Sequence, residues 1–434
     1  MTDLQQVLES VPTEFDYFEP RMIQAAVTSE YAQAFLPISS RQPGAPIEFD
    51  VPSSDNQYLD VSNSKLEVKC KITKANGTDI EGDSNVGPVN MLLHALFKSV
   101  DMEINNKLVT EPSTMHGYRA FMETILTYFE GVEKTRLVSE GWVKDEGNGD
   151  ALDDFRVGAA GANSGFKTRA RKYANSAVIT LLGRPHLDLF HQNKDLPPNC
   201  SIKLRLIPNE SAFYLKKHTD EAELYRLKIM ATRLFMRTKE VSPSIALAHL
   251  TMAQKHNIRI PYTKVALKTI MIPNGTSTYQ HDGVYMGQLP DRIVIALVGD
   301  KRMNVTYTLN PFRFSHFGLS YLALKVNGEQ IPRIAYDPNF TTNDYIREYF
   351  ALFEGLGMDI GNKAINLTPE QWASDYPIFI FRLAPGGLPS VPKSGNVRIE
   401  LKFRVALGAN INLVCFAEYA SLLEIDRAHN VITF

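Results

Sequence analysis

The sequence contains few cysteines. Cys70, Cys200 and Cys415 are the only three in 434 residues, and they lie far apart. An odd number of widely spaced thiols provides neither a complete disulfide framework nor the close spacing of a zinc site. We therefore expect a protein that folds in a reducing compartment with its thiols buried.

Long hydrophobic runs and an excess of charge are also absent. The longest clean apolar run, IVIALV at Ile293–Val298, is far shorter than a membrane-spanning helix. The N-terminal sequence MTDLQQVLESVPTEFDYFEP has neither a basic start nor an apolar block, so we expect no signal peptide. The net charge of −2 creates no overall field that favours nucleic acid or an anionic membrane. These absences predict a protein without a membrane span, made in the cytosol or nucleus.

Enzyme signatures are missing as well. GLGMDIG at Gly355–Gly361 is close to a dinucleotide-binding motif, but it follows a predicted helix, whereas that motif follows a strand and opens a helix. His186 and His191, in HLDLFH, have no further metal ligands near them in the sequence. Cys200 and Cys415 are typical of buried thiols and not of a Cys–His nucleophile. We predict that the protein is not an enzyme and has no catalytic residue, cofactor or bound metal.

One dense basic run is present, KTRARK at Lys167–Lys172. Its charged members Lys167, Arg169, Arg171 and Lys172 form a possible contact for DNA phosphates or a nuclear signal. An acidic stretch, KDEGNGDALDD, lies just upstream. We favour a solvated loop, or one paired with that acidic stretch, over the nucleic-acid hypothesis.

Strand patterns dominate the chain, and we expect about sixteen strands. VRIELKFRV at Val397–Val405 alternates apolar and charged residues throughout, and IKLRLI at Ile202–Ile207 repeats the pattern 197 positions earlier (399 minus 202). Such alternation, rich in β-branched and aromatic residues, is typical of half-buried strands. Further long strands are expected at Tyr58–Ile72, Tyr225–Arg237 and Asn412–Ile425.

Only a few helices are predicted. The first spans Met115–Phe129 and the second Asp344–Phe353, with Asn343 placed to cap the second; a third follows Ser242-Pro243 and ends near Lys255. Helical spacing predicts one buried face on each of the first two. The expected buried residues are Tyr118, Phe121, Met122, Ile125 and Phe129 on the first helix, and Ile346, Tyr349, Phe350 and Phe353 on the second.

The chain contains a weak internal repeat. Glu103–Gly131 and Lys325–Gly355 each predict a strand, a tight Asn turn, a short strand, a loop and one amphipathic helix. The helices finish in YFEG and LFEG, where Gly131 and Gly355 are expected to stop them. An alternating strand and a long final strand follow in both halves, which predicts a doubled domain.

Two β-rich halves with few helices must bury the faces of their sheets against each other. Sandwiches and jelly rolls are the available solutions, and each half has enough strand for eight, so we predict an all-β fold of two tandem domains with a few short helices in loops. The expected limits are an N-terminal arm at residues 1–25, a first β-domain at 26–238 and a second at 239–434. The boundary falls near Thr238–Ser244, and the poorly patterned stretch 145–174 is expected to be a long loop.

Several stretches resemble a known family. In chain order they cover most of the sequence from about residue 45 onward. They are GPVNMLLHALFKSVDMEINNKLV (Gly87–Val109), YRAFMETILTYF (Tyr118–Phe129), GQLPDRIVIALV (Gly287–Val298), NPFRFSHFGLSYLALKVNGEQIP (Asn310–Pro332) and AEYASLLEIDRAHNVI (Ala417–Ile432). The chain resembles double jelly-roll major capsid proteins of the Polinton (Maverick) and adintovirus-like group. It departs from the family in having Phe129-Glu130-Gly131 where Asn-Tyr-Gly is usual.

The resemblance implies that the fold is a double jelly roll, two tandem eight-stranded jelly rolls with a few short helices in loops, the first roll at 26–238 and the second at 239–434. It also implies a structural role. Three such chains form a homotrimeric, hexon-like capsomer of pseudo-hexagonal outline, and trimers tile an icosahedral shell around double-stranded DNA. It also implies a minor penton capsid protein as partner, enclosed DNA without sequence-specific contact, and a place in the virion after assembly inside the host cell. The alternatives are a carbohydrate- or receptor-binding jelly-roll protein that forms no shell, and a β-sandwich enzyme of unrecognised type.

Overall fold

The computed structural model describes residues 24–38, 44–52, 54–146, 163–218, 222–304, 306–360, 364–384 and 393–433. Most of the expected N-terminal arm, residues 1–23, lies outside the described residues. So does the middle of the expected loop at 145–174, residues 147–162.

The first half of the chain forms two four-stranded antiparallel sheets, ordered β1-β10-β3-β7 and β2-β8-β5-β6. A short pair, β4 with β9, lies beside them. The strands are β1 (Val27–Phe35), β2 (Ile47–Val51), β3 (Gln57–Lys74), β4 (Val86–Pro88), β5 (Phe97–Ile104), β6 (Lys107–Leu108), β7 (Ile179–Gly183), β8 (Ile202–Pro208), β9 (Leu215–Lys217) and β10 (Tyr225–Val241).

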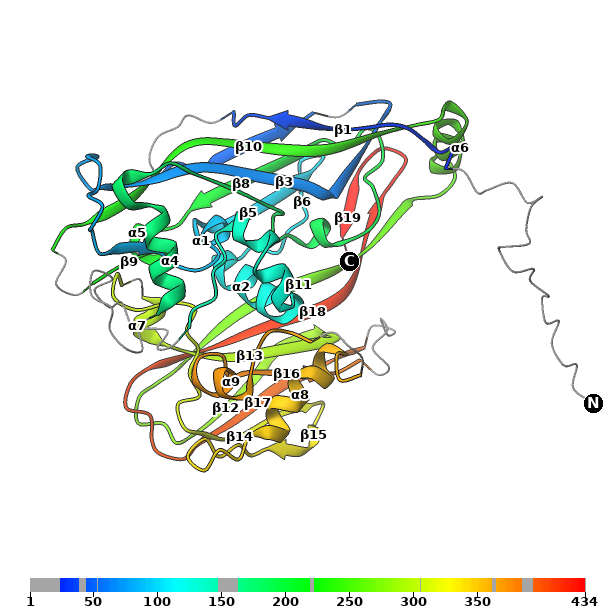
Figure 1. Ribbon diagram of the computed structural model, residues 1–434. Helices are drawn as coiled ribbons and strands as arrows, with labels where there is room; N and C mark the ends of the chain where they lie inside the picture. The colour runs from blue at the N-terminus through cyan, green and yellow to red at the C-terminus, as the bar shows by residue number, and fades with distance from the viewer. Residues whose placement is uncertain are drawn as a thin grey trace, which may run out of the picture.

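The second half forms two further sheets, ordered β11-β18-β13-β16 and β12-β17-β14-β15, with β19 added beside β18. The strands are β11 (Ile258–Ile272), β12 (Thr278–Gln288), β13 (Arg292–Gly299), β14 (Leu319–Val326), β15 (Glu329–Tyr336), β16 (Ile378–Arg382), β17 (Ser394–Phe403), β18 (Ile411–Ile425) and β19 (Val431–Thr433). Figure 1 shows most of this strand set, in yellow-green to red, below the first one, in blue to green, while β19 lies higher, beside the first half.

The two halves share one strand order. Leaving β4, β9 and β19 aside, the eight main strands of each half are arranged as 1-8-3-6 in one sheet and 2-7-4-5 in the other, counted along the chain. A sandwich of two such four-stranded sheets is a jelly roll. The predicted doubled domain is therefore present, and its two copies follow each other along the chain.

The two alternating stretches are equivalent strands, each the seventh of its half. In β8 the side chains of Ile202, Leu204 and Leu206 are buried, and in β17 the side chains at positions 397, 399, 401 and 403 are buried. The predicted strand extended too far at its C-terminal end, because β17 ends at Phe403 and Val405 is exposed.

The predicted Asn turns are confirmed. Asn105 and Asn106 join β5 to β6 with φ angles of 49° and 63°. Asn327 and Gly328 join β14 to β15 with φ angles of 52° and 91°. Two successive residues with positive φ form the hairpin turn whose twist matches the flanking strands, and Asn and Gly adopt it at little cost.

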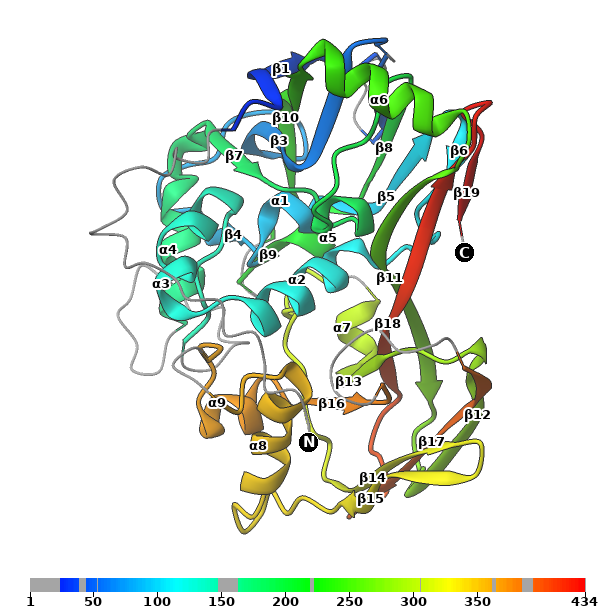
Figure 2. The same cartoon turned by 90° about the vertical axis from the view of Figure 1, so that its right-hand side faces the viewer.

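Short helices lie in the connections between the strands of the two sandwiches. Figure 2 shows α2, α3, α4, α8 and α9 on one side of the molecule and the long strands β11 and β18 on the other. The helices are α1 (Leu92–Ala95), α2 (His116–Thr127), α3 (Glu130–Glu133), η1 (Arg136–Glu140), α4 (Ser164–Lys172), η2 (Ala174–Ser176), η3 (Asp188–His191), α5 (Ser211–Tyr214), α6 (Pro243–Ala253), α7 (Asp300–Met303), α8 (Ile346–Leu356) and α9 (Pro369–Ser374).

The three predicted helices are present, and α6 begins after Ser242 as predicted, but the ends of the other two were predicted wrongly. Helix α2 stops at Thr127, and Gly131 lies inside α3. Helix α8 runs through Gly355 and ends at Gly357, which has a φ of 70°. Gly355 serves packing instead, because a Cβ there would lie 2.5 Å from the side chain of Ile380 on β16. Asn343 does not cap α8, which begins after Tyr345.

The predicted buried face is confirmed for α2 and only partly for α8. On α2 all the expected side chains are buried except Phe129, which lies beyond the helix end. On α8, Phe353 is buried, but Ile346 and Phe350 are 56% and 50% exposed. Helix α8 approaches β16 at the small residue Gly355, so part of its apolar face is turned to solvent.

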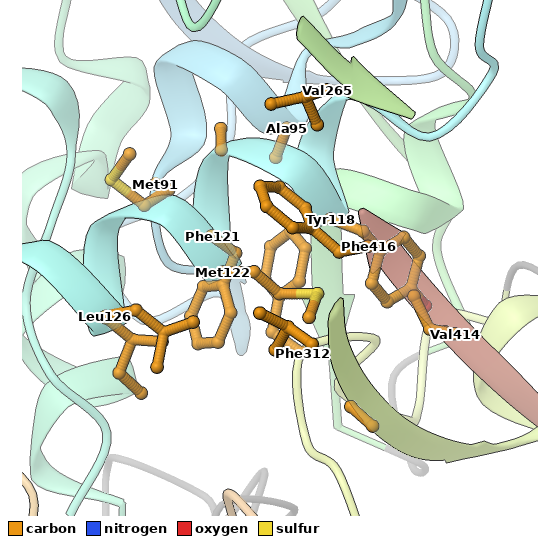
Figure 3. Close-up of a cluster of buried hydrophobic side chains, with 14 of the residues drawn as sticks. Met91, Ala95, Tyr118, Phe121, Met122, Leu126, Val265, Phe312, Val414 and Phe416 are labelled. Atoms are coloured by element: carbon orange, nitrogen blue, oxygen red, sulfur yellow. The ribbon is translucent and has the colours of Figure 1, made fainter. Parts of the chain in front are cut away.

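An aromatic seam joins the two halves. We define it as Tyr118 and Phe121 of α2, Phe213 of α5, and Phe312 and Phe314 of the segment before β14. Phe121 stacks on Phe312 with ring centroids 4.6 Å apart, and Tyr118 and Phe213 meet Phe312 edge-on. Figure 3 shows the labelled members beside Val414 and Phe416 of β18. Each aromatic pair adds about 0.5–1.5 kcal/mol beyond the area it buries, so the halves form one continuous core.

Polar contacts reinforce the seam. Lys144 donates to Gln371 at 2.8 Å, and Asn366 donates to Glu133 at 2.7 Å. Each pair joins a loop or helix of the first half to a residue of the second. The two jelly rolls are therefore held in a fixed relative position by both apolar and hydrogen-bonded contacts.

Candidate functional site

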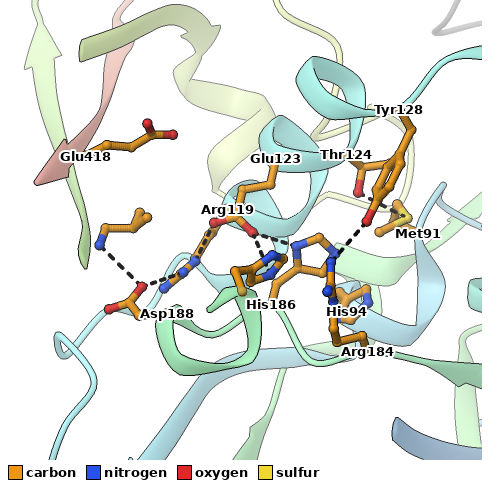
Figure 4. A network of polar contacts seen from close by, with 12 residues as sticks. Met91, His94, Arg119, Glu123, Thr124, Tyr128, Arg184, His186, Asp188 and Glu418 are labelled. Atoms are coloured by element: carbon orange, nitrogen blue, oxygen red, sulfur yellow. Dashed lines mark hydrogen bonds and ion pairs between the residues drawn. The ribbon is translucent and has the colours of Figure 1, made fainter. Parts of the chain in front are cut away.

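A buried polar network lies under α2, close to the seam (Figure 4). Arg119 donates to Glu123 at 2.8 Å and to Asp188 at 2.6 Å. The backbone N–H of Val265, on β11, donates to the same Asp188 oxygen at 3.3 Å. The network thus connects α2 and η3 of the first half to a strand of the second.

Charge pairing keeps Glu123 ionised. Burial alone raises the pKa of this carboxyl, but the nearby Arg119 guanidinium and a hydrogen bond from His186 together hold its pKa well below the usual range. A buried ion pair of this kind fixes geometry more than it adds stability. The network is a positioning device that ties α2 to η3 and β11.

The histidines singled out in the sequence lie beside this network. His186 Nδ1 is 2.6 Å from Glu123 Oε2, and His191 Nε2 is 3.7 Å from the same oxygen. His94 and Glu140 lie on the other side of His186, with His94 Nε2 3.2 Å from Glu140 Oε2. Sequence spacing gave no sign of these neighbours, because they come from α1, α2 and η1, up to 92 positions away (186 minus 94).

The three thiols are buried, as expected. Burial raises the pKa of Cys70, Cys200 and Cys415 to about 12 in each case. A thiol attacks only as the thiolate, so none of them is activated as a nucleophile near neutral pH.

A surface hollow of the first half has no catalytic character. It measures about 440 Å³ and lies between β10 and the end of β8, with Ile47, Leu96 and Tyr214 among its apolar walls. Its lining includes one carboxylate, Glu210, and no histidine or cysteine. A general acid–base pair or a nucleophile with its base is therefore not formed there.

The basic run forms the helix α4, and its members face different surroundings. Arg169 is buried, donating to the Pro88 carbonyl at 3.0 Å and to Asp145 at 2.6 Å. Asp145 also accepts from Asn310 of the second half at 3.1 Å. The suggested pairing with the upstream acidic stretch is thus real for Arg169, whose charge is used within the fold.

The other members of the run remain at the surface. Lys167 is half-buried, and Arg171 and Lys172 are exposed. Contact with DNA phosphates, or use as a nuclear signal, stays a prediction for these three residues.

Exposed apolar side chains gather on α6, which connects β10 to β11. None of its residues is buried, and Leu247, Leu250 and Met252 are 66%, 52% and 54% exposed. A hydrogen bond between Tyr58 of β3 and His249, 2.8 Å long, holds the helix against the first sandwich. An apolar helix exposed in this way is typical of a surface that contacts another protein.

Among the residues that the structure describes, no helix is long and apolar enough to cross a bilayer.

Comparisons with known proteins agree with this architecture. No protein-family model matches the sequence. An uncharacterized protein from Caenorhabditis elegans is 22% identical over 406 residues, which cover 90% of this chain and 94% of that protein.

Solved structures give a stronger match. A chain of the Sputnik virophage has a TM-score of 0.67 at 12% identity, covering 99% of this chain and 93% of that chain. The mavirus major capsid protein has a TM-score of 0.56 at 12% identity, covering 100% of this chain and 96% of that chain. The chain has the double jelly-roll fold. A chain of the PBCV-1 virus capsid has a TM-score of 0.58 at 10% identity, and the match covers 96% of this chain and 99% of that chain.

These structural neighbours are viral double jelly-roll major capsid proteins, and they are shell components rather than enzymes. At identities of 10–12% the likeness establishes the fold alone.

Proposed function

We propose that this protein is a major capsid protein. The observation that carries the proposal is the pair of jelly rolls with one strand order, locked side by side by the aromatic seam and its polar contacts. A rigid block of two like modules suits a shell, in which many copies must present the same outline. The likeness to virophage and mavirus capsid proteins supports this assignment.

In the proposed assembly, three chains form a capsomer. Three blocks of two rolls place six similar rolls around one axis, so a threefold oligomer acquires a pseudo-hexagonal outline that tiles an icosahedral shell around double-stranded DNA. Closing such a ring requires a heterologous contact, in which the flank of one roll meets a different flank of the next chain. The exposed apolar face of α6 offers part of that contact surface, and the net charge of −2 does not oppose close packing of many copies.

The finer assignments rest on the sequence resemblance. They are membership of the Polinton (Maverick) and adintovirus-like group, a minor penton protein as partner, and a location in the virion. We place the N-terminal arm at residues 1–25, the first roll at 26–238 and the second at 239–434. The connection between the rolls lies just beyond this boundary, since β10 ends at Val241 and β11 begins at Ile258, with α6 in between.

The exposed members of the basic run are candidates for the inner surface. Unlike Arg169, which is buried, the other charged members of α4 are half-buried or exposed: Lys167, Arg171 and Lys172. Contact with enclosed DNA through such residues is electrostatic and independent of base sequence.

Light scattering coupled to size-exclusion chromatography tests the proposal, together with negative-stain images of the purified chain. We expect a particle of about three times the 48.7 kDa chain mass, with a hexagonal outline in projection. Monomers across the accessible concentration range, with no hexagonal particles, would contradict the capsid role and favour a binding protein that forms no shell.

A further inference from the structure

A second group of side chains lies beside the Arg119 network and has the composition of a metal site. It consists of His94 on α1, Glu140 at the end of η1 and His186 in the loop after β7. One donor atom of each lies within 4.8 Å of the other two, and all three side chains are buried. We call these three residues the His94 cluster.

The spacing inside the cluster fits coordination. His94 Nε2 and Glu140 Oε2 are 3.2 Å apart. Ligands bound to tetrahedral zinc at about 2.0–2.2 Å lie roughly 3.3 Å from each other. The pair is therefore already at the separation of two ligands of one ion, and little movement is needed to bring an ion between them.

The carboxylates of the region differ in their partners. Glu123 and Asp188 share the guanidinium of Arg119, at 2.8 and 2.6 Å. Glu140 hydrogen-bonds His94, and although the charge of Arg136 also stabilises its carboxylate, that guanidinium lies over the ring of Tyr128. A buried carboxylate that faces two imidazoles is costly unless positive charge is supplied nearby.

A carboxylate beside His186 orients its ring in the way that is common for metal-binding histidines. Its Nδ1 is 2.6 Å from Glu123 Oε2, and Glu123 is itself held by Arg119. Metal-binding histidines commonly use one ring nitrogen for a carboxylate and the other for the metal. With Nδ1 occupied by Glu123, Nε2 is the nitrogen left to bind an ion.

A neighbouring group of donor atoms lies nearer to solvent and shares His186 with the cluster. Glu123, His186 and His191 also bring donor atoms within 4.8 Å of one another, and the His191 side chain is 30% exposed. Glu123 is already engaged by Arg119 and His186, so this outer group is less suited to hold an ion permanently. It does connect solvent to His186, which both groups share.

We propose that His94, Glu140 and His186 bind one divalent transition-metal ion of the zinc class. Two imidazoles and a carboxylate match the preferences of zinc, cobalt or nickel and not those of calcium or magnesium. Three protein ligands leave one position for water. The ion would tie α1, η1 and the loop after β7 together, so its role is structural, and it does not depend on the proposed shell function.

The test uses the full-length chain, stripped of metal with a chelator and titrated with ZnCl₂ in a calorimeter. We expect one Zn²⁺ per chain, a higher melting temperature with the ion, and the visible d–d bands of four-coordinate cobalt when Co²⁺ replaces it. His94→Gln and Glu140→Gln should each abolish stoichiometric binding. Glu123→Gln, which removes the orienting charge from His186, should weaken affinity about 10–100-fold.

His256→Gln, at an exposed histidine far from the cluster, is the matched control and should bind Zn²⁺ like the parent chain. Circular dichroism of each variant without metal shows whether the variant still folds, and so separates loss of a ligand from loss of the fold. The cobalt spectrum of the parent chain tests the site without any substitution. Absence of stoichiometric binding by the parent chain, or binding that survives both His94→Gln and Glu140→Gln, would overturn the proposal. A parent chain that forms trimers but binds no Zn²⁺ would overturn the metal site while leaving the capsid role intact.

Discussion

At the scale of single residues, Arg169 is held by backbone carbonyls and by Asp145 in the interior. Arg169→Ser would leave the buried Asp145 carboxylate without its cation. We expect the free energy of unfolding to fall by about 3–5 kcal/mol, measured by urea denaturation.

The matched variant replaces the surface members of the same helix, Lys167, Arg171 and Lys172, with Ser. Exposed side chains away from the core usually change stability by less than about 0.5 kcal/mol each, so trimers should form normally. The affinity for double-stranded DNA should fall, and it should also decrease less steeply as the salt concentration rises. A triple variant that unfolds as readily as Arg169→Ser would show that these residues are structural too.

Asp60 gives the fold a specific dependence on pH. Although burial raises its pKa, hydrogen bonds from Lys239, Asn63 and Ser62 lower it to about 2. The carboxyl titrates near 3.9 in an unfolded chain. Its contribution to stability is therefore complete above about pH 4 and is lost as the pH falls through 2.

Melting temperatures of the parent chain and of Asp60→Asn, recorded from pH 6 to pH 2, check this. The difference between the two proteins should be constant above about pH 4 and shrink below it, because protonation removes the same charge as the substitution. A difference that does not change with pH would contradict the role given to Asp60.

Sequence patterns identified many buried apolar residues correctly and missed the polar partners. Alternation with a period of two correctly predicted that Ile202 and Leu204 are buried, because successive side chains of a strand point to opposite faces of the sheet. Arg169 looked like its neighbours, because nothing local shows that Pro88 and Asp145 enclose it. Partners brought together only by the fold leave no spacing signal.

At the scale of elements, α8 offers a paired test of burial. Phe353 is buried and packs edge-on against Tyr349 with centroids 5.1 Å apart, whereas Phe350, on the same helix, is half exposed. Phe353→Asp should destabilise the protein by about 3 kcal/mol or more, since it places a charge in an apolar contact. Phe350→Asp should change the melting temperature of the isolated chain little. Equal effects of the two substitutions would contradict the observed helix orientation.

Helix ends were predicted less well than helix positions. Gly131, Gly355 and Asn343 carry the usual local signals for ends and caps, yet none of them has that role. At Gly355 the close approach of β16 explains the glycine, and Gly357 supplies the left-handed residue that ends α8. Packing between elements decided how the same residue types were used.

At the scale of the whole molecule, α6 tests the proposed assembly. Leu247→Asp combined with Leu250→Asp should leave the melting temperature of the monomer almost unchanged, because neither side chain is buried in the single chain. The same change should reduce the trimer fraction measured by light scattering, because it would place charges in an apolar contact between copies. Val405→Asp, at an exposed apolar residue beyond β17, is the control and should assemble normally. Normal trimers from the α6 variant would show that another face makes the contact.

The overall architecture was predictable because it is repeated. The same order of strand, Asn turn, strand and helix occurs twice, and the structure confirms it as one sheet order used twice. The joining of the halves was not predictable, since Phe312 follows no periodic pattern and meets Phe121 only in the folded chain.

That meeting has a consequence for synthesis. Phe312 leaves the ribosome 191 positions after Phe121 (312 minus 121), which at 5–20 residues per second is a delay of about 10–40 s. During that interval Tyr118 and Phe121 have their first-half partners Phe213 and Trp142 but not Phe312, so the nascent first half exposes part of its apolar core surface until translation completes the second module.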